Sequence, residues 1–413
     1  MSEIQLSDDE SLALHIKAGS IFKPRTPING REFFAGRWDQ LTRITDSVRQ
    51  TGFHIVLFGE RGVGKTSLAN MAKILLNLTE LSGQDRRLVV RVNATADDSF
   101  SDLWKKAFDE MLVADDIIGF DIGQEKNLIS LKKKMGINSG DKLSIDDVRR
   151  MLRGLKGSVF IFDEFDRADH AVRKNYTDLI KALSDYGIDT TIILVGVADT
   201  INDLVKDHAS IVRCLTQIQL PRMNQRELRE ILSKASNALG TGFDESAASL
   251  IVRTSQGMPH YTHLIGLHST REALSHGSRK IFRKDVLDSF HKAVNESEQS
   301  IRDRYYKAIH SAHKDALYDD VLLACAIAST KERDDLGYFY LSDVVPHLSR
   351  ILKRQNIKIS TFQKHINEFC EDRGKILEKV GKQRSYKYRF SDPLLLPYIL
   401  MIGGGKSSEV LDE

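Results

Sequence analysis

Residues 54–68 read HIVLFGERGVGKTSL. An apolar run ends at a glycine, two more glycines follow, and the stretch closes on a lysine and two hydroxyl residues. The spacing G-x-x-x-x-G-K-[ST] predicts a buried strand, a phosphate-binding loop and a helix from Thr66 to about Leu76. Glycines in such a loop permit backbone torsions that turn successive N–H groups toward one anion, at the positive end of the helix. A strand before the loop and a helix after it argue against a chance glycine-rich turn.

This loop is expected to bind a nucleoside triphosphate. Lys65 can reach the β- and γ-phosphates, and the Thr66 hydroxyl can ligate Mg²⁺. ATP and Mg²⁺ are therefore the predicted cofactors. The expected phosphate-binding residues are Gly59, Glu60, Arg61, Gly62, Val63, Gly64, Lys65, Thr66 and Ser67.

A second apolar strand ends in acidic residues. Residues 158–166 read SVFIFDEFD, and Asp163 and Glu164 follow the run Val159 to Phe162. At the carboxyl end of a buried strand, Asp163 suits the coordination sphere of Mg²⁺, and Glu164 can orient and deprotonate an attacking water. Alone, the two acids could merely cap the following helix. Together with the phosphate loop they favour hydrolysis, so we predict an ATPase. Its turnover is either fast or slow enough to act as a timer.

A third buried strand, Thr191 to Val195, runs into GVADT. Asp199 in this segment could hold the water or sense the γ-phosphate. An ordinary strand-to-helix turn with Asp199 as the N-cap explains the same residues.

These motifs, VLFGERGVGKTSL, FIFDEFD and ILVGVADT, resemble the AAA+ ATPases. The origin-recognition/Cdc6-like group, with its relatives in bacterial transposition and defence, is the most similar. The resemblance extends from about Pro24 to the C-terminus. It implies that Pro27, Ile28 and Arg37 line the adenine pocket.

The resemblance also implies roles for residues farther along the chain. Arg213 sits where an arginine finger that reaches a neighbour's nucleotide would lie, with Arg222 as the second choice. Asp199 stands where the family usually has Asn, Thr or Ser. His260 follows a Gly-x-Pro-like turn where many relatives carry an arginine that contacts the γ-phosphate. His260 is thus either an altered second sensor or only a helix-start residue.

Composition limits the classes of protein to consider. The chain has 413 residues, 41% hydrophobic residues and a formal net charge of +3. We expect two or three domains, no membrane span, no signal peptide and a cytoplasmic location. The three cysteines are too scattered for a zinc site or a disulfide framework.

The predicted fold is an α/β P-loop NTPase core, a parallel sheet with flanking helices, followed by an all-α lid and a C-terminal winged helix. Strands are expected near 54–58, 88–93, 158–162 and 191–195, and the lysine-rich segment 119–142 is expected to be a loop insertion. The predicted regions are an N-terminal, loosely structured extension (1–23), the core (24–222), the lid (223–295), a linker helix with the winged helix (296–402) and a disordered tail (403–413).

The predicted winged helix has residue types that suit DNA. Its third helix would start near Ser360, and strands 376–380 and 385–390 would form a hairpin rich in Lys and Arg with interleaved tyrosines. Such a wing can follow phosphates while the helix enters the major groove. A charged hairpin used for protein contacts is the alternative. The candidate DNA contacts are Lys364, Lys379, Lys382, Arg384, Lys387 and Arg389.

Two functions fit these features. The first is an ATP-hydrolysing AAA+ machine or switch that forms a ring or filament with ATP and engages duplex DNA, in antiviral defence, transposition or replication. The second is a STAND-like signalling NTPase whose nucleotide-driven oligomerisation controls a separate effector protein, with the winged helix as an interaction or autoinhibitory module. A small-molecule kinase shares the phosphate loop but is disfavoured by the DEFD strand and the helical C-terminal half.

Overall fold

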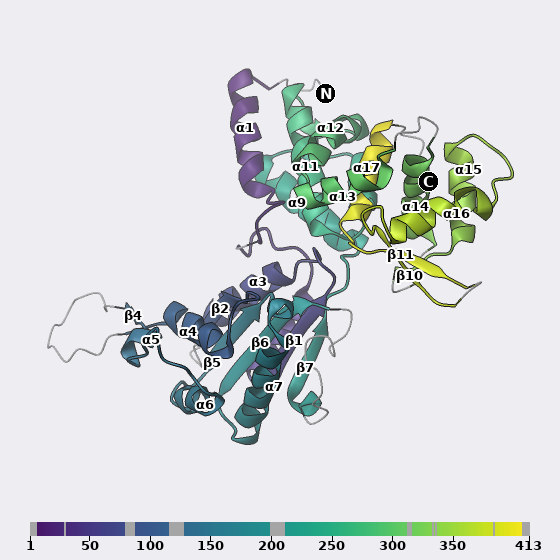
Figure 1. Ribbon diagram of the computed structural model, residues 1–413. Helices are drawn as coiled ribbons and strands as arrows, with labels where there is room; N and C mark the ends of the chain where they lie inside the picture. The colour runs from purple at the N-terminus through teal and green to yellow at the C-terminus, as the bar shows by residue number, and fades with distance from the viewer. Residues whose placement is uncertain are drawn as a thin grey trace. The chain divides into compact units, whose positions relative to one another are not determined.

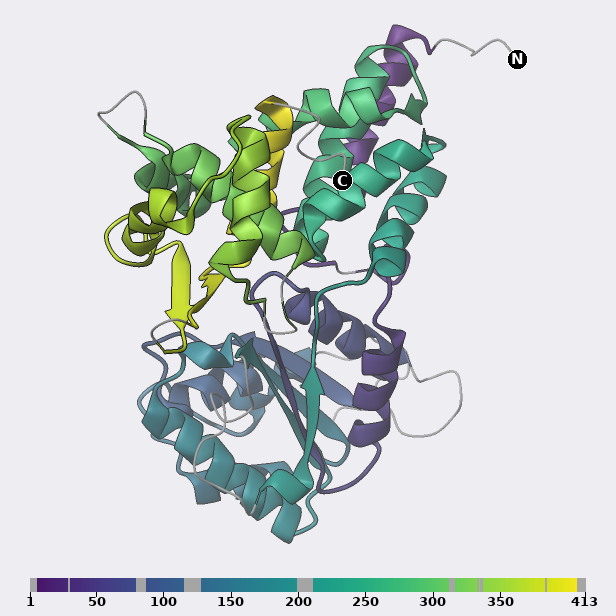
Figure 2. The ribbon, with the colours of Figure 1, turned by 90° about the vertical axis from the view of Figure 1, so that its right-hand side faces the viewer.

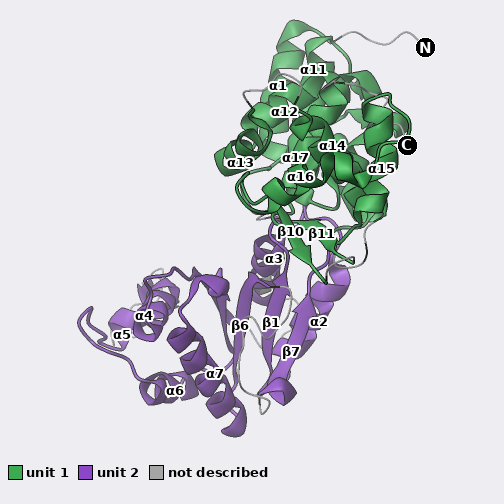
Figure 3. Cartoon of the chain, turned by 45° about the vertical axis from the view of Figure 1, so that its right-hand side comes forward, with its two compact units in different colours: residues 1–26, 222–413 green, residues 27–221 purple. Residues whose placement is uncertain are grey.

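The computed structural model describes residues 6–28, 30–78, 87–114, 128–198, 211–311, 316–332, 334, 337–382 and 385–406. The chain divides into two compact units (Figure 3). The core unit comprises residues 27–221, and the helical unit combines residues 1–26 with 222–413.

A five-stranded parallel sheet forms the centre of the core unit, in the order β2-β5-β6-β1-β7 (Figure 1). Its strands are β1 (His54–Gly59), β2 (Leu88–Asn93), β5 (Ser158–Asp163), β6 (Thr190–Val197) and β7 (Leu215–Gln219). The predicted α/β core is thus confirmed, and the first four strands correspond to the predicted ones. Strand β7, an edge strand beside β1, was not predicted.

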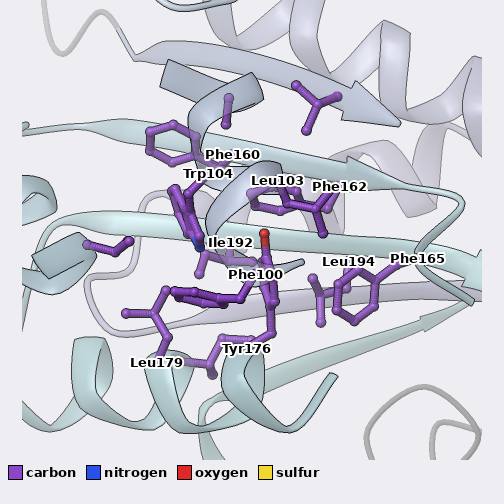
Figure 4. Close-up of a cluster of buried hydrophobic side chains, with 14 of the residues drawn as sticks. Phe100, Leu103, Trp104, Phe160, Phe162, Phe165, Tyr176, Leu179, Ile192 and Leu194 are labelled. Carbon is purple, nitrogen blue, oxygen red and sulfur yellow. The ribbon is translucent and has the colours of Figure 1, made fainter. Parts of the chain in front are cut away.

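Alternating side chains of the sheet pack against helices on its two faces. On one face, Phe160 and Phe162 pack against Trp104 of α4 (Phe100–Glu110) and Tyr176 of α7 (His170–Asp185), as Figure 4 shows. Trp104 is fully buried, and its ring stacks on that of Tyr176. Large rings bury much apolar surface, so this cluster stabilises the sheet that holds the functional loops. Helices α2 (Trp38–Val48) and α3 (Lys65–Leu78) contact β1.

The predicted loop insertion at 119–142 is partly ordered. Residues 115–127 lie outside the described residues, but β4 (Leu128–Ser130) pairs with β3 (Leu112–Ala114) and is followed by α5 (Leu131–Lys134). The side chain of Leu131 is buried in the aromatic core, and this apolar anchor corrects the prediction of a loop. Helix α6 (Ile145–Arg153) completes the core unit.

The lid helices are α9 (Gln225–Leu239), α10 (Glu245–Ser255), α11 (Pro259–Ser275) and α12 (Arg283–Glu296), with α13 (Gln299–Ile309) after them. The two-residue strands β8 (Gly242–Phe243) and β9 (Lys280–Ile281) pair between them. Figures 1 and 2 show α1 (Asp8–Ile21) beside α11.

The N-terminal segment was predicted to be loosely structured. Instead, residues Asp8–Ile21 form a helix that packs on the lid. Ser7 and Glu10 form a capping box, and the Ser11 hydroxyl donates to the Leu274 carbonyl at 2.7 Å. Phe22 packs against Gly266 of α11, where a Cβ would lie 2.7 Å from the ring. These two partners of the helix therefore lie more than 240 residues farther along the chain.

The C-terminal module has the predicted order of three helices and a hairpin. Its helices are α14 (Tyr318–Lys331), α15 (Leu341–Ile351) and α16 (Ile359–Cys370), and strands β10 (Leu377–Val380) and β11 (Lys387–Phe390) pair antiparallel. Helix α17 (Leu395–Lys406) follows and continues through residues 403–406, which corrects the predicted start of the tail. Among the described helices none is long and apolar enough to cross a membrane.

Candidate nucleotide site

The loop from Gly59 to Lys65 has the backbone of a phosphate cradle. Gly62 and Gly64 have positive φ angles of 86° and 98°, which L-residues with a side chain rarely adopt. Gly59 serves a second purpose, because a Cβ there would lie 2.4 Å from the Leu220 carbonyl oxygen. The loop therefore runs directly against the segment that follows β7.

Lys65 is buried beneath this loop. Its Nζ donates to the carbonyls of Gly59 at 2.9 Å and Glu60 at 2.8 Å. Burial lowers the pKa of the ammonium to about 8, and the nearby charges of Asp166, Asp163 and Glu60 oppose that shift. Below pH 8 a positive charge is thus held at the base of the cradle, on carbonyls that phosphate oxygens could replace.

Asp163, the predicted magnesium ligand, is 2% exposed and forms a salt bridge with Arg91 of the neighbouring strand β2. The Oδ2 atom lies 3.0 Å from Arg91 Nη2 and 3.2 Å from Nε. Arg91 also donates to Asn70 Oδ1 on α3 at 2.7 Å and to Asn93 Oδ1 at 3.0 Å. One guanidinium therefore links the acid at the end of β5 with the helix that follows the phosphate loop.

Glu164 adopts a left-handed backbone conformation, with φ 55° and ψ 32°. Its N–H donates to Asp163 Oδ1 at 2.9 Å, which ties the turn to the carboxylate predicted to bind the metal. The half-exposed Glu164 carboxylate accepts a hydrogen bond from Arg167 Nη1 at 2.8 Å. The predicted base is thus accessible to water and is held by a cation three residues farther on.

Asp166 connects the acidic turn to the next strand. Its Oδ1 accepts from the N–H of Val197, the last residue of β6, at 2.8 Å. Strand β6 lies between β1 and β5, so its carboxyl end is at the edge of the sheet that carries both the phosphate loop and Asp163. Asp199 follows two residues later but lies outside the described residues.

The predicted adenine-pocket residues lie close to the loop in the core unit. The Ile28 N–H donates to the Ser67 hydroxyl at 3.2 Å, and Ile28 is buried whereas Pro27 is exposed. Arg37 is also buried, and its Nη2 donates to the Pro221 carbonyl at 2.5 Å. The structure thus gives Arg37 a structural tie within the core unit; adenine contact stays a prediction.

Arg213 lies at the end of the sheet where the strands begin, whereas the phosphate loop lies where β1 ends. It precedes β7, whose first residue, Leu215, pairs with His54 at the start of β1, so the length of a strand, about 15 Å, separates it from its own loop. Its exposed guanidinium lies 3.3 Å from Asp185 Oδ1. Arg222, the second choice for a finger, belongs to the helical unit and lines a cavity beside α9.

His260 lies near the start of α11, after Pro259, in the helical unit. Its Nδ1 lies 2.5 Å from the Pro24 carbonyl oxygen, and its ring packs edge-on against Tyr261. This contact gives His260 a structural role in joining the segment after α1 to the lid. A role as second sensor remains a prediction.

The cations predicted to bind DNA are largely paired within the C-terminal module. Lys387 Nζ lies 2.9 Å from Asp334 Oδ2, and Arg389 Nε lies 2.9 Å from Glu378 Oε2. Lys379 Nζ lies 4.0 Å from the ring centroid of Tyr386. Lys364 is highly exposed and lies 3.8 Å from Glu368 Oε1, Lys382 is exposed, and Arg384 lies outside the described residues.

The residues at the loop fit ATP and Mg²⁺. The positive-φ glycines form an amide cradle, Lys65 supplies a buried cation, and Asp163 supplies an anionic oxygen at the same sheet edge. Sequence reasoning missed Arg91 and Asp166. The signal for Arg91 was a charged residue inside the otherwise apolar strand LVVRVN.

Several solved structures are similar over most of the chain. Cdc6p from Pyrobaculum aerophilum is 15% identical, with 95% of this chain and 98% of that chain covered and a TM-score of 0.47. A Walker-type ATPase of Pyrococcus abyssi is 16% identical, with 92% and 99% covered and a TM-score of 0.48. RuvB of Thermotoga maritima, a Holliday junction branch migration motor, is 15% identical, with 89% and 96% covered and a TM-score of 0.42. No curated protein matches the sequence.

The decisive comparison is with a protein family. The family described as Novel STAND NTPase 1 matches residues 28–276, more than half of the chain, including the phosphate loop, both acids and most of the lid. This match confirms the predicted P-loop NTPase. The chain belongs to the Novel STAND NTPase 1 family.

Proposed function

We propose that this protein is an ATP-dependent signalling switch, in which ATP binding and hydrolysis control self-assembly and contact with a separate effector protein. The observation that carries the proposal is the pairing inside the nucleotide site. Lys65 donates to two loop carbonyls, and Asp163 is salt-bridged to Arg91. Both groups that would hold Mg·ATP are thus bonded to the protein itself.

When a nucleotide binds, the contacts of Lys65 and Asp163 within the protein must be replaced by contacts with the phosphates and the metal. To hold the β- and γ-phosphates, Lys65 has to leave the carbonyls of Gly59 and Glu60. To ligate the metal together with Thr66, Asp163 has to give up Arg91. ATP supplies the bond to be hydrolysed, and Mg²⁺ neutralises charge on its phosphates.

The exchange reaches beyond the loop because Arg91 contacts three elements. Its guanidinium bonds to Asp163 at the end of β5, to Asn70 on α3 and to Asn93 at the end of β2. A ligand that takes Asp163 therefore leaves a partly buried cation that must find new acceptors. Such an exchange between two sets of contacts is what a two-state switch requires.

Hydrolysis in this proposal depends on Glu164 as the residue that orients and deprotonates water. Arg167 Nη1 donates to Glu164 Oε2, so a water that is to use this oxygen competes with Arg167. This competition at one of the two carboxylate oxygens supports a slow timer over a rapid motor.

Self-assembly is supported by the position of Arg213. A strand length separates this exposed arginine from its own phosphate loop, so it could complete a nucleotide site only on a neighbouring subunit. In an ATP-dependent ring or filament, an arginine finger of one subunit can contact the nucleotide bound to the next.

An effector protein is favoured over DNA as the partner of the C-terminal module. Phosphates would have to compete with Asp334 for Lys387 and with Glu378 for Arg389. DNA engagement is retained as a second candidate because Lys364 on α16 has an 82% exposed side chain and only a long ion pair, 3.8 Å, with Glu368.

The test is the solution mass of the Glu164→Gln protein with ATP and Mg²⁺, with and without duplex DNA, together with its ATPase rate. We expect retained ATP binding, a rate reduced by a factor of about 10² to 10³, and ATP-dependent assembly that DNA does not change. Glu110→Gln, on the exposed end of α4, is the matched control. Normal hydrolysis by Glu164→Gln would disprove the role of Glu164. A monomer throughout would disprove the switch by assembly, and assembly that needs DNA would establish the second candidate.

A further inference from the structure

A cavity of about 640 Å³ lies within the helical unit. Its walls come from the start of α9, the second half of α10 with the turn after it, and the last turn of α14. Lid and C-terminal module thus share one cavity. A volume of this size is typical of sites for small-molecule ligands.

The lining is strongly cationic. Four of its residues carry a positive charge, namely Arg222, Arg229, Arg253 and Lys331, and the described lining includes no acidic residue. Helix α9 also starts at this wall, with Asn224 as its N-cap, so the positive end of its dipole adds to the field. Both contributions favour an anionic ligand.

The wall is built by the backbone as well as by side chains. The Met223 N–H donates to the Gly257 carbonyl at 2.9 Å, and Gly257 has φ +80°. A Cβ at Gly257 would lie 2.6 Å from Arg222 Cβ and 3.0 Å from the Met223 carbonyl oxygen. Only glycine therefore lets the two wall segments approach this closely.

One cation of the lining is already oriented. Arg229 donates to both carboxylate oxygens of Glu245, at 3.0 Å and 2.7 Å, and to the Ser249 hydroxyl at 2.7 Å. This fork fixes the guanidinium at the cavity wall, and Glu245 balances its charge. The net positive charge of the lining therefore comes from Arg222, Arg253 and Lys331.

We propose that this cavity binds a phosphate-bearing small molecule of about the size of a nucleotide, at a site separate from the phosphate loop. Arginine forks match phosphate oxygens bidentately. The amides of Gln225 and Gln256 and the apolar side chains of Leu228 and Val252 can contact the rest of such a ligand. Because Lys331 belongs to α14 and Arg253 to α10, the ligand would tie the C-terminal module to the lid.

The experiment titrates inorganic tripolyphosphate by calorimetry into full-length protein that carries Lys65→Ala, which disables the phosphate loop. We expect one binding event. The further pair Arg253→Gln and Lys331→Gln should weaken it at least about tenfold, since two charged hydrogen bonds to the phosphate oxygens are lost. Arg226→Gln, an exposed arginine on α9 outside the lining, should leave the affinity unchanged.

Lys331 is exposed, so Lys331→Gln alone tests the site if the Arg253 substitution prevents folding. It should weaken binding several-fold, and Lys331→Arg should restore it. The proposal is overturned if the Lys65→Ala protein does not bind tripolyphosphate, or if the paired variant binds as tightly as its parent. It is also overturned if a polyglutamate peptide binds more tightly than tripolyphosphate, because the cavity would then serve an acidic peptide. None of these results depends on hydrolysis or assembly.

Discussion

Two groups of basic side chains, one at the phosphate loop and one on the C-terminal hairpin, look alike in the sequence but face different partners. Lys65 is buried and donates to backbone carbonyls, and Arg91 holds a carboxylate that is itself 2% exposed. On the hairpin, Lys387 and Arg389 pair with Asp334 and Glu378 near the surface.

The two groups differ in the binding free energy that a phosphate ligand would gain from them. At the loop, a charge held away from water interacts strongly with an incoming phosphate, because the local dielectric constant is low. At the hairpin, water and salt screen the charges, so each ion pair contributes little to stability. A count of basic residues therefore says less about binding than their burial and their present partners do.

The largest expected effect is the loss of ATP affinity in Lys65→Ala. Removing a buried cation that faces the phosphates should cost about 3 to 5 kcal/mol, a reduction of about two to four orders of magnitude in affinity. Isothermal titration with ATP and Mg²⁺ measures it. Lys382→Ala, an exposed hairpin lysine, is the matched control and should bind as wild type does. Affinity within threefold of wild type for Lys65→Ala would remove the contrast between the two regions.

Arg91→Met should destabilise the core unit by about 2 to 4 kcal/mol, because it leaves the buried Asp163 carboxylate without its cation. Mg²⁺ with ATP should restore more stability to this variant than to wild type, since the metal takes the vacated place beside Asp163. Urea unfolding followed by tryptophan fluorescence reports on this unit, because the chain's two tryptophans, Trp38 and Trp104, both lie in it. Equal stabilisation of both proteins by Mg·ATP would refute the exchange at Asp163.

The strand that leads into the loop should make the core unit sensitive to acid. Burial lowers the pKa of His54 to about 3, and its Nδ1 accepts from the Ile192 N–H at 3.0 Å. Between pH 3 and 6.5 the unfolded chain binds the proton and the folded chain does not, so stability falls as the pH drops. From pH 7 to 5 this histidine should account for about 2 kcal/mol. In His54→Gln, measured by the same fluorescence, that part of the pH dependence should vanish; an unchanged slope would contradict the assignment.

The smallest effect is expected at the hairpin. Arg389→Met should lower stability by less than about 1 kcal/mol, because its ion pair with Glu378 is partly solvated. Circular dichroism melting should show a shift of only a few degrees at most. A loss as large as that of Arg91→Met would show that the hairpin pairs are as strong as those at the nucleotide site.

Much of the core unit could be predicted from sequence because its signals are local. A buried strand reads as a continuous apolar run, and the phosphate loop has a fixed spacing of glycines and lysine. Strand β7, LTQIQ, is short and three of its five residues are polar, so no such run marks it. The helix α1 carried a readable capping box in Ser7 and Glu10, but its packing partners lie more than 200 residues away.

The partners of the functional side chains could not be predicted in the same way. Arg91 meets Asp163 because β2 lies beside β5 in the sheet, with Asn93 opposite Asp163. Lys387 meets Asp334 because the hairpin folds back against residues before α15. Both contacts depend on long-range topology, which decides whether a charge is available to a ligand.

The placement of α1 in the helical unit has a consequence for synthesis. This helix leaves the ribosome before the whole core unit, whereas α9, the first of the lid helices on which it packs, begins only after residues 22–224 have been translated. At ordinary elongation rates that interval is roughly 10 to 40 s. During this interval the core unit can fold, whereas α1 lacks its packing partners and the apolar side chains of Ile21 and Phe22 stay exposed. A chaperone could bind these side chains until α9 and α11 have been made.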